Sequence, residues 1–299
     1  MAADVRRLAA DLALDIRNDL GESPRWDPVS AELLWVDITP GTLLRASVVP
    51  SSAGPIVLGA PRVTALGGSL SAISPRAGGG LIAALGGGVS LIDPDGSVHP
   101  IATLRGTGPW RLNDGSADPR GSFWIGSVNL ALAQRCCSLW RVDPDRSVHE
   151  MVTEVGVSNG LGWSPDGRTM YYIDTMRLSV FAYDFDLESG ALTGRRRLYR
   201  AGDGDGYPDG LAVDADGMVW VALHGAGQVR CLDPAGTLRA VVEVPVEDVT
   251  ACCFGGADLG TLFITTSRAL AKGEPDEHAG GVYACRPGSV GLPPHSFAG

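Results

Sequence analysis

Four polar residues occupy equivalent places in the chain, each beside a turn that leads into a short apolar strand. They are Glu22, Asn113, Asn159 and Asp209. Asp209 is the clearest example, because it follows Pro208 and precedes Gly210, where the backbone must turn sharply. Carboxylate and amide oxygens suit calcium, magnesium or manganese, whereas a set poor in histidine and thiolate argues against structural zinc.

The two carboxylates of this group impose a constraint of their own. If Glu22 and Asp209 lay close together, they would repel each other unless a cation or a proton lay between them. Any one of the four residues, taken alone, could simply form a turn, because Asn-Gly and Asp-Gly pairs commonly do so. The prediction of a metal site therefore depends on several of them meeting in space.

The segments that carry these residues share one plan. The pattern of residues 207–224 predicts a turn, a strand, an Asp-Gly hairpin and a return strand that brings His224 level with Asp209. Similar units occupy residues 21–38, 111–127 and 158–174. A unit that recurs every ~40–50 residues with about four short strands indicates a β-propeller, and 299 residues correspond to about six such units. We therefore expect an all-β, six-bladed β-propeller with four-stranded blades, forming a single domain over residues 1–299, with a β-sandwich or a pair of barrels as the alternative.

A propeller would bring the four polar residues together. The innermost strand of each blade lines the central channel, so residues at the start of these strands face one another at one end. The return strands end at the same place, and their last polar residues should rim this opening. These are Asp37, Asn129, Asp174 and His224. We expect His224 to contact substrate as a hydrogen-bond donor or proton shuttle, with a plain polar rim residue as the alternative.

Composition excludes several other classes. Acidic residues outnumber basic ones by 34 to 24, and the formal charge of −10 disfavours nucleic acid and anionic membrane surfaces as partners. The chain has no long apolar span, and residues 1–15 lack the apolar core of a secretory signal, so we expect a cytoplasmic protein. Residues 1–11 are expected to form a short helical turn or to fray.

The remaining candidate residues have structural interpretations. The six cysteines show no Cys-x-x-Cys spacing, so they are expected to be small, buried and reduced. Tryptophans within strands should pack between blades. Aspartates in hairpins at the far ends of the strands should be turn residues. These are Asp93, Asp95, Asp143, Asp145, Asp166, Asp214, Asp216 and Asp233.

Several longer motifs, taken together, resemble a known family. The chain resembles the gluconolactonase, regucalcin and luciferin-regenerating-enzyme family of six-bladed propellers over nearly its whole length, including the ending at residues 291–299. The motifs are Gly21-Glu-Ser-Pro24, Leu34-Trp-Val-Asp-Ile38, Arg111-Leu-Asn-Asp-Gly115, Ser158-Asn-Gly-Leu161, Tyr171-Tyr-Ile-Asp174, Pro208-Asp-Gly-Leu211, Trp220-Val-Ala222 and Cys252-Cys-Phe-Gly-Gly256.

The resemblance implies specific roles. It implies a single divalent cation bound by Glu22, Asn159 and Asp209, with Asp209 also acting as the general base. It further implies that Arg111 and Asn113 hold the substrate. Members of the family hydrolyse sugar lactones or other cyclic esters, so we expect a small-molecule lactone as partner and a monomer or small homo-oligomer. Calcium is the expected ion, with zinc, magnesium or manganese as alternatives.

One segment departs from the family pattern. After the strand that ends at Ser127, regucalcin-like members carry a longer acidic loop with a glutamate that touches the sugar. Here residues 128–134 are short and apolar. This difference favours a less polar ring or a biosynthetic intermediate over an aldonolactone. Arg111 still indicates an oxygen-rich or anionic group on the substrate.

Two alternative functions remain compatible with the sequence. The same metal site could serve an isomerase, a lyase or a phosphotriesterase. The chain could also be a non-catalytic, calcium-binding regulatory propeller, although Arg111 and Asn113 beside the metal residues argue against a pure binding protein. A serine hydrolase is not supported, because none of the five histidines has an evident nucleophile partner in the sequence.

Overall fold

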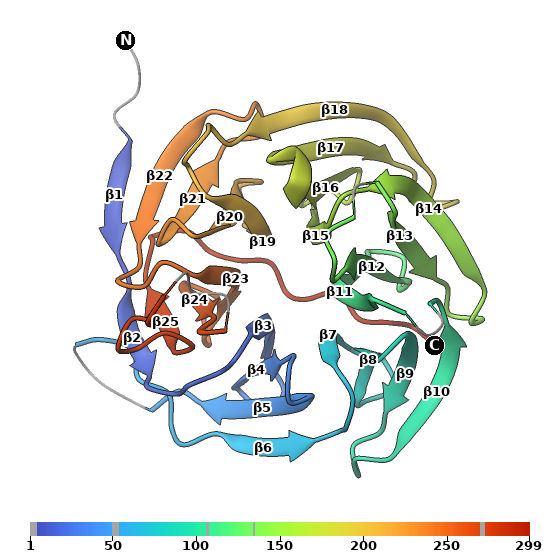
Figure 1. The fold of residues 1–299 in the computed structure, drawn as a ribbon, viewed down its shortest axis with the longest axis horizontal. Coiled ribbons are helices and arrows are strands. Elements are labelled where there is room, and N and C mark those ends of the chain that lie inside the picture. The colour runs from blue at the N-terminus through green and yellow to red at the C-terminus, as the bar shows by residue number, and fades with distance from the viewer. Residues whose placement is uncertain (1–4, 50–53, 106–107, 134, 270–272) are drawn as a thin grey trace.

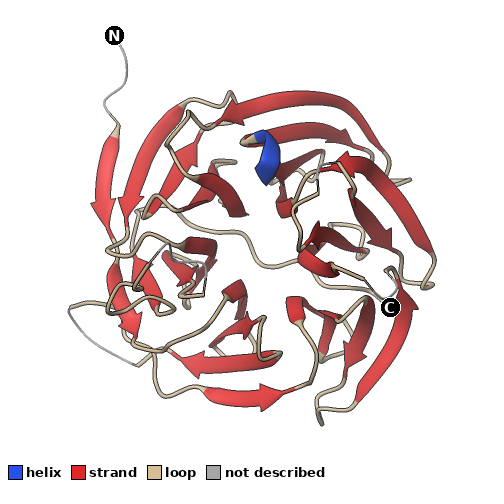
Figure 2. Ribbon diagram, in the orientation of Figure 1, coloured by secondary structure: helices blue, strands red, loops and turns tan. Residues whose placement is uncertain are grey.

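Six β-sheets stand in a ring around a central channel (Figures 1 and 2). The structure is a computed structural model that describes residues 5–49, 54–105, 108–133, 135–269 and 273–299. Within these ranges the chain forms 25 strands and one 3-10 turn, η1 (Thr175–Arg177). The expected six-bladed β-propeller is confirmed. No helical element of the described ranges is long and apolar enough to cross a membrane.

Each blade is an antiparallel sheet whose strands follow one another from the channel outwards. Blade 1 contains β3 (Gly21–Asp27), β4 (Glu32–Asp37), β5 (Thr42–Ser47) and β6 (Arg62–Ala65). Blade 2 contains β7 (Leu70–Pro75), β8 (Leu81–Leu85), β9 (Gly88–Ile92) and β10 (Val98–Thr103). Blade 3 contains β11 (Trp110–Ala117), β12 (Phe123–Asn129), β13 (Cys137–Val142) and β14 (Val148–Val155).

The other three blades continue this order around the ring. Blade 4 contains β15 (Ser158–Trp163), β16 (Thr169–Asp174), β17 (Ser179–Phe185) and β18 (Leu192–Arg200). Blade 5 contains β19 (Tyr207–Val213), β20 (Val219–His224), β21 (Gln228–Leu232) and β22 (Leu238–Glu243). Blade 6 contains β23 (Val249–Gly255), β24 (Thr261–Thr266) and β25 (Val282–Cys285).

Two N-terminal strands close the ring. β2 (Asp11–Leu14) pairs antiparallel with β25 and completes blade 6, while β1 (Arg6–Ala9) pairs parallel with β22 as a fifth strand of blade 5. The prediction of a helical turn or frayed segment over residues 1–11 is therefore wrong for Arg6–Ala9, and residues 1–4 lie outside the described ranges. The outer edge of β22 offers unpaired backbone groups, and pairing with it overrides the weak local preference of the segment.

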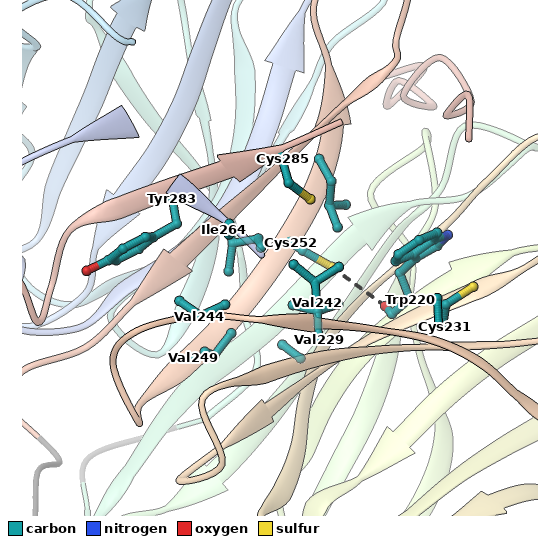
Figure 3. Packing of buried hydrophobic residues seen from close by; sticks show 14 of the residues in the cluster. Trp220, Val229, Cys231, Val242, Val244, Val249, Cys252, Ile264, Tyr283 and Cys285 are labelled. Atoms are coloured by element: carbon teal, nitrogen blue, oxygen red, sulfur yellow. Dashed lines mark hydrogen bonds between the residues drawn. The ribbon is translucent and has the colours of Figure 1, made fainter. Parts of the chain in front are cut away.

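The core lies between adjacent blades. Figure 3 shows the cluster between blades 5 and 6, where the thiol of Cys252 donates a hydrogen bond to the Trp220 carbonyl at 3.6 Å. Tryptophans are fully buried in the second strands of blades 1, 3 and 5. All six cysteines are free, and five of them are buried as predicted, whereas Cys136 is partly exposed. Burial raises the pKa of the Cys253 thiol to about 12, which keeps it protonated.

The two ends of the channel differ. We call the end where the innermost strands begin the mouth, and the end where they finish the base. The C-terminal tail, residues 286–299, crosses the middle of the ring (Figure 1) and lies along the base. Its Phe297 is buried, the Phe297 N–H donates to the Pro75 carbonyl at 2.8 Å, and His295 packs edge-on against Trp163.

Candidate active site

All six innermost strands share an irregularity near the mouth. The pairing of each with its neighbour in the blade shifts register within its first half, as at a β-bulge. The shifts fall between Glu22 and Arg25, Leu70 and Ala72, Leu112 and Gly115, Ser158 and Leu161, Pro208 and Leu211, and Val249 and Ala251. A bulge releases a residue from regular alternation and can re-aim its side chain. The fold therefore repeats, six times around the mouth, a place where a side chain can turn towards the channel.

The predicted residues lie at these shifts, and their side chains interact with one another. We call Glu22, Asn113, Asp114, Asn159 and Asp209 the axial site. Burial, followed by the charge of Asp114, raises the pKa of Glu22 to about 8. Such mutual effects require the carboxyl groups of different blades to lie near each other. The predicted convergence on the channel is present in the structure, while the role of each residue stays a prediction.

Asp209 is held in the same environment. The residue as a whole keeps partial exposure, but its carboxyl group is enclosed. Burial, and then the charges of Glu22 and Asp114, raise the pKa of Asp209 well above its ordinary value, while a hydrogen bond from Asn159 opposes the shift. The carboxyl groups of Glu22 and Asp209 therefore resist being ionised together. A cation between them would remove that penalty.

Asn159 provides an oxygen beside these carboxyls. Its Nδ2 donates to Thr175 Oγ1 at 3.1 Å, and that hydroxyl donates to the Pro208 carbonyl at 2.8 Å. Its Oδ1 is buried and has no hydrogen-bond partner within the described part of the chain. A buried acceptor without a partner is costly, so it indicates a place for a ligand. Gly160 lets β15 approach β19, because a Cβ there would lie 2.6 Å from the Asp209 carbonyl oxygen.

Arg111 and Asn113 form one unit on β11. Arg111 Nη1 donates to Asn113 Oδ1 at 2.5 Å, and Asn113 Nδ2 donates to the Ser158 carbonyl at 2.8 Å. Burial lowers the pKa of Arg111, and the neighbouring carboxylates of Glu22 and Asp209 oppose that shift. The guanidinium therefore lies within electrostatic reach of both carboxyls. The two residues predicted to bind substrate are adjacent to those predicted to bind metal.

Asp114 was missed by the sequence analysis. Its buried carboxylate accepts a hydrogen bond from the Gly115 N–H at 2.7 Å. Burial raises the pKa of Asp114, and Arg25 opposes the shift. Regular alternation would send Asn113 and Asp114 to opposite faces of the strand, and only the register shift turns both towards the interior. An Arg-Leu-Asn-Asp-Gly run on an inner strand is the one sequence signal that could have indicated it.

The predicted rim residues mainly hold loops in place. Asp37 accepts hydrogen bonds from the backbone N–H groups of Asp19 and Leu20. Asp174 accepts one from Arg177 Nε at 2.9 Å, and Asn129 caps its own loop through the Ala131 N–H. All of these bonds stay within one blade or its connecting loop. These contacts indicate that Asp37, Asn129 and Asp174 have structural roles.

His224 lies at the edge of the mouth. Its Nε2 is 3.4 Å from Asp248 Oδ1, and its Cα is paired with that of Tyr207 at the start of β19. Together these three residues line a cleft of about 420 Å³ over blade 5. The predicted contact between His224 and substrate stays a prediction, with this cleft as its location.

The axial site differs from common metal clusters. No group of three or more His, Cys, Asp and Glu side chains is placed to hold a metal ion among the residues that the structure covers. The predicted ligand set is of another kind, since it combines two carboxylates with an amide oxygen. Two of its features fit a cation: the raised pKa of both carboxyls and the unpartnered Oδ1 of Asn159.

Comparison with known proteins defines the family. The family described as SMP-30/Gluconolactonase/LRE-like region matches residues 20–268, and this chain belongs to it. Regucalcin of Danio rerio is 34% identical over 294 residues, which are 95% of this chain and 96% of that protein. Membership of the family supports a lactonase-type function with a small-molecule substrate.

Two solved structures are similar over nearly the full length. A calcium-binding protein, regucalcin, from Agrobacterium tumefaciens has a TM-score of 0.88 at 26% identity, covering 99% of both chains. A luciferin-regenerating enzyme has a TM-score of 0.86 at 25% identity, covering 97% of this chain and all of that one. The resemblance inferred from the motifs is therefore confirmed.

Proposed function

We propose that this protein is a divalent-metal-dependent hydrolase that opens a lactone. The observation that carries the proposal is the meeting of two buried carboxyl groups and an unpartnered amide oxygen at the channel mouth. Glu22 and Asp209 come from different blades, so only the closed ring brings them together. Membership of the gluconolactonase family supports the same chemistry.

Glu22, Asn159 and Asp209 are the residues that would hold the ion. Oxygen donors and two carboxylates favour calcium, with magnesium, manganese or zinc as alternatives. The similar protein from Agrobacterium tumefaciens is described as calcium-binding, which supports this choice. When bound, the ion would polarise the ester carbonyl and acidify water.

The residues of the chain then divide the remaining work. Asp209 accepts a proton from the attacking water, and this requires its ionised form, which a nearby positive charge favours. Arg111 binds an oxygen-rich or anionic group of the substrate through its guanidinium. Asn113 is oriented by Arg111 and by the Ser158 carbonyl, so it presents a fixed amide beside the substrate group that Arg111 binds. His224 would contact a more distant part of the substrate from the cleft over blade 5.

The apolar loop beside the mouth bears on the substrate. Leu130 and Leu132 follow β12 and are 60% and 56% exposed, while Gln134 lies outside the described ranges. The β12–β13 connection lies at the mouth, because β12 runs antiparallel to β11. Apolar side chains at this place support a lactone whose ring carries fewer hydroxyl groups than an aldonolactone.

A metal-dependence assay tests the proposal. The protein is freed of ions with a chelator and then assayed with calcium, magnesium, manganese or zinc against a lactone panel and an organophosphate triester. Ion-dependent opening of at least one lactone is expected, with loss of turnover in Asp209→Asn and full turnover in Asp216→Asn, an exposed turn residue of the same blade. If the protein turned over the triester and none of the lactones, its proposed function would be phosphotriesterase rather than lactonase.

The non-catalytic alternative has one observation in its favour. The similar protein from Agrobacterium tumefaciens is described as calcium-binding rather than by a reaction. A protein with this role would bind calcium tightly and open no substrate of the panel. The same assay, combined with calorimetric titration of calcium, separates the two functions.

A further inference from the structure

Ser71 occupies the register shift of blade 2. The shift falls between Leu70 and Ala72 on β7. Leu70 packs in the cluster shared with blade 1, and Ala72 packs in the cluster shared with blade 3. The flanking side chains therefore take the two opposite faces of the sheet. Because β7 is the innermost strand, the direction left for the extra residue is towards the channel.

The hydroxyl of Ser71 is buried without a partner. The residue is 2% exposed, and its Oγ makes no hydrogen bond to any described residue. Burying a hydroxyl in this way is unfavourable unless something else satisfies it. Asn159 Oδ1 is in the same state at the corresponding place in blade 4. Two buried polar atoms on different blades thus lack a partner at the same level of the propeller.

Three other small hydroxyl residues of the innermost strands are already used by the fold. Thr250, at the register shift of blade 6, donates to the Gly21 carbonyl at 2.5 Å. Ser23 Oγ accepts the Ile73 N–H at 3.0 Å and ties β3 to β7. Ser74 Oγ accepts the Ala117 N–H at 3.0 Å and ties β7 to β11. Packing between these strands therefore does not require the Ser71 hydroxyl.

The position of β7 places Ser71 among the residues of the axial site. β7 lies between β3, which carries Glu22, and β11, which carries Asn113 and Asp114 (Figure 1). A ligand that contacts those residues from the channel passes the start of β7. A serine hydroxyl can both donate and accept, so it can bind a water molecule or a substrate oxygen.

We propose that Ser71 is a further ligand-contacting residue of the axial site, whose hydroxyl binds an oxygen atom held there. The oxygen belongs to a water on the divalent ion or to the lactone itself. This role rests on the proposed function, because that function supplies both ligands. It extends the site to blade 2, which has none of the residues assigned above.

Ser71→Ala and Ser74→Ala form a matched pair on one strand. The test measures the melting temperature without divalent ions, the calcium dissociation constant by calorimetry, and KM for a lactone that the wild type opens. Ser71→Ala should keep or slightly raise the melting temperature and weaken calcium binding or raise KM by roughly 3- to 10-fold, the worth of one hydrogen bond. Ser74→Ala should lower the melting temperature by about 2 °C and leave both constants unchanged.

The calcium dissociation constant and the KM of Ser71→Ala together identify the molecule to which the oxygen belongs. A weaker calcium constant assigns Ser71 to the ion's water, and a raised KM with an unchanged calcium constant assigns it to the lactone. Unchanged constants in Ser71→Ala would overturn the proposal, as would a loss of stability equal to that of Ser74→Ala. A wild type that binds neither calcium nor any lactone would overturn the proposed function as well, so the two failures are distinguishable.

Discussion

Buried carboxylates at the two ends of the channel have very different surroundings. At the base, Asp214 is fully buried and accepts three hydrogen bonds, from the backbone N–H groups of Asp216 and Met218 and from Trp220 Nε1 at 2.9 Å. Asp118 in blade 3 repeats this arrangement with Trp124 Nε1 at 2.8 Å. At the mouth, Glu22 is 7% exposed, and among the described residues its carboxyl accepts a hydrogen bond only from the N–H of its own neighbour Ser23.

The difference separates a structural role from a functional one. A buried carboxylate whose oxygens are satisfied by the protein fixes a turn and needs nothing more. One that is buried beside other carboxylates and left with few donors is unfavourable until a proton or a cation joins it. Both kinds of site are built from aspartates or glutamates of the same propeller. Their hydrogen-bond partners, rather than their burial, indicate which kind each one is.

Replacing Asp209 by asparagine should produce the largest effect at the mouth. Loss of a general base typically lowers kcat by about 10²–10⁴-fold, and loss of a carboxylate should weaken ion binding as well. Without divalent ions the melting temperature should not fall, because one source of repulsion with Glu22 is removed. Lactone kinetics, calorimetry and thermal melting measure the three quantities. A variant with near wild-type kcat would refute the assignment.

Asp214→Asn should have the opposite effect, with a loss of stability and little change in turnover. The substitution exchanges one acceptor for an amide donor next to backbone N–H groups, so we expect unfolding free energy to fall by about 2–4 kcal/mol. Turnover of the folded protein should stay within twofold of wild type, since Asp214 lies at the base. Urea unfolding and lactone kinetics test this, and Asp118→Asn provides a repeat in another blade. A stable but inactive variant would break the comparison.

Sequence patterns could predict the repeat, the mouth and the turn role of the aspartates at the far ends, but not the contacts that hold those aspartates. The Asp-Gly pairs at Asp209 and Asp216 look alike in sequence, and only their positions within a blade separate them. Asp214 is a turn residue as predicted, yet its bond to Trp220 depends on how the hairpin folds back.

The features that escaped prediction depend on register and on long-range pairing. Asp114 and Ser71 reach the channel through register shifts, and a shift of one residue leaves no mark in the hydrophobic pattern. β1 is a strand because β22, distant in sequence, offers it an edge. Local sequence carries neither kind of information.

The pH dependence of stability should also distinguish the mouth from the base, with a smaller effect than the substitutions above. Without divalent ions the folded state holds the Glu22 proton up to a pKa of about 8, against 4.5 for an ordinary glutamate. The folded state therefore binds more protons, so this stabilisation is complete below pH 4.5 and is lost as pH rises towards 8.

Thermal melting from pH 5 to pH 8.5 in a chelator should show a fall of a few degrees attributable to this group. Glu22→Gln should reduce that fall, and saturating calcium should do so in the wild type, since the ion takes the place of the proton. An identical pH dependence in wild type and Glu22→Gln would show that Glu22 is not the group responsible.

The smallest expected effect belongs to an exposed turn aspartate at the base. Asp166 accepts hydrogen bonds from Ser164 Oγ at 2.6 Å and from the Arg168 N–H, in a turn that resembles the one at Asp214. Because solvent can replace these bonds, Asp166→Ala should change the unfolding free energy by only about 0.5 kcal/mol. Urea unfolding beside Asp214→Asn measures the contrast. An equal loss in both variants would mean that turn geometry, rather than the enclosed Trp220 bond, makes the base aspartates structural.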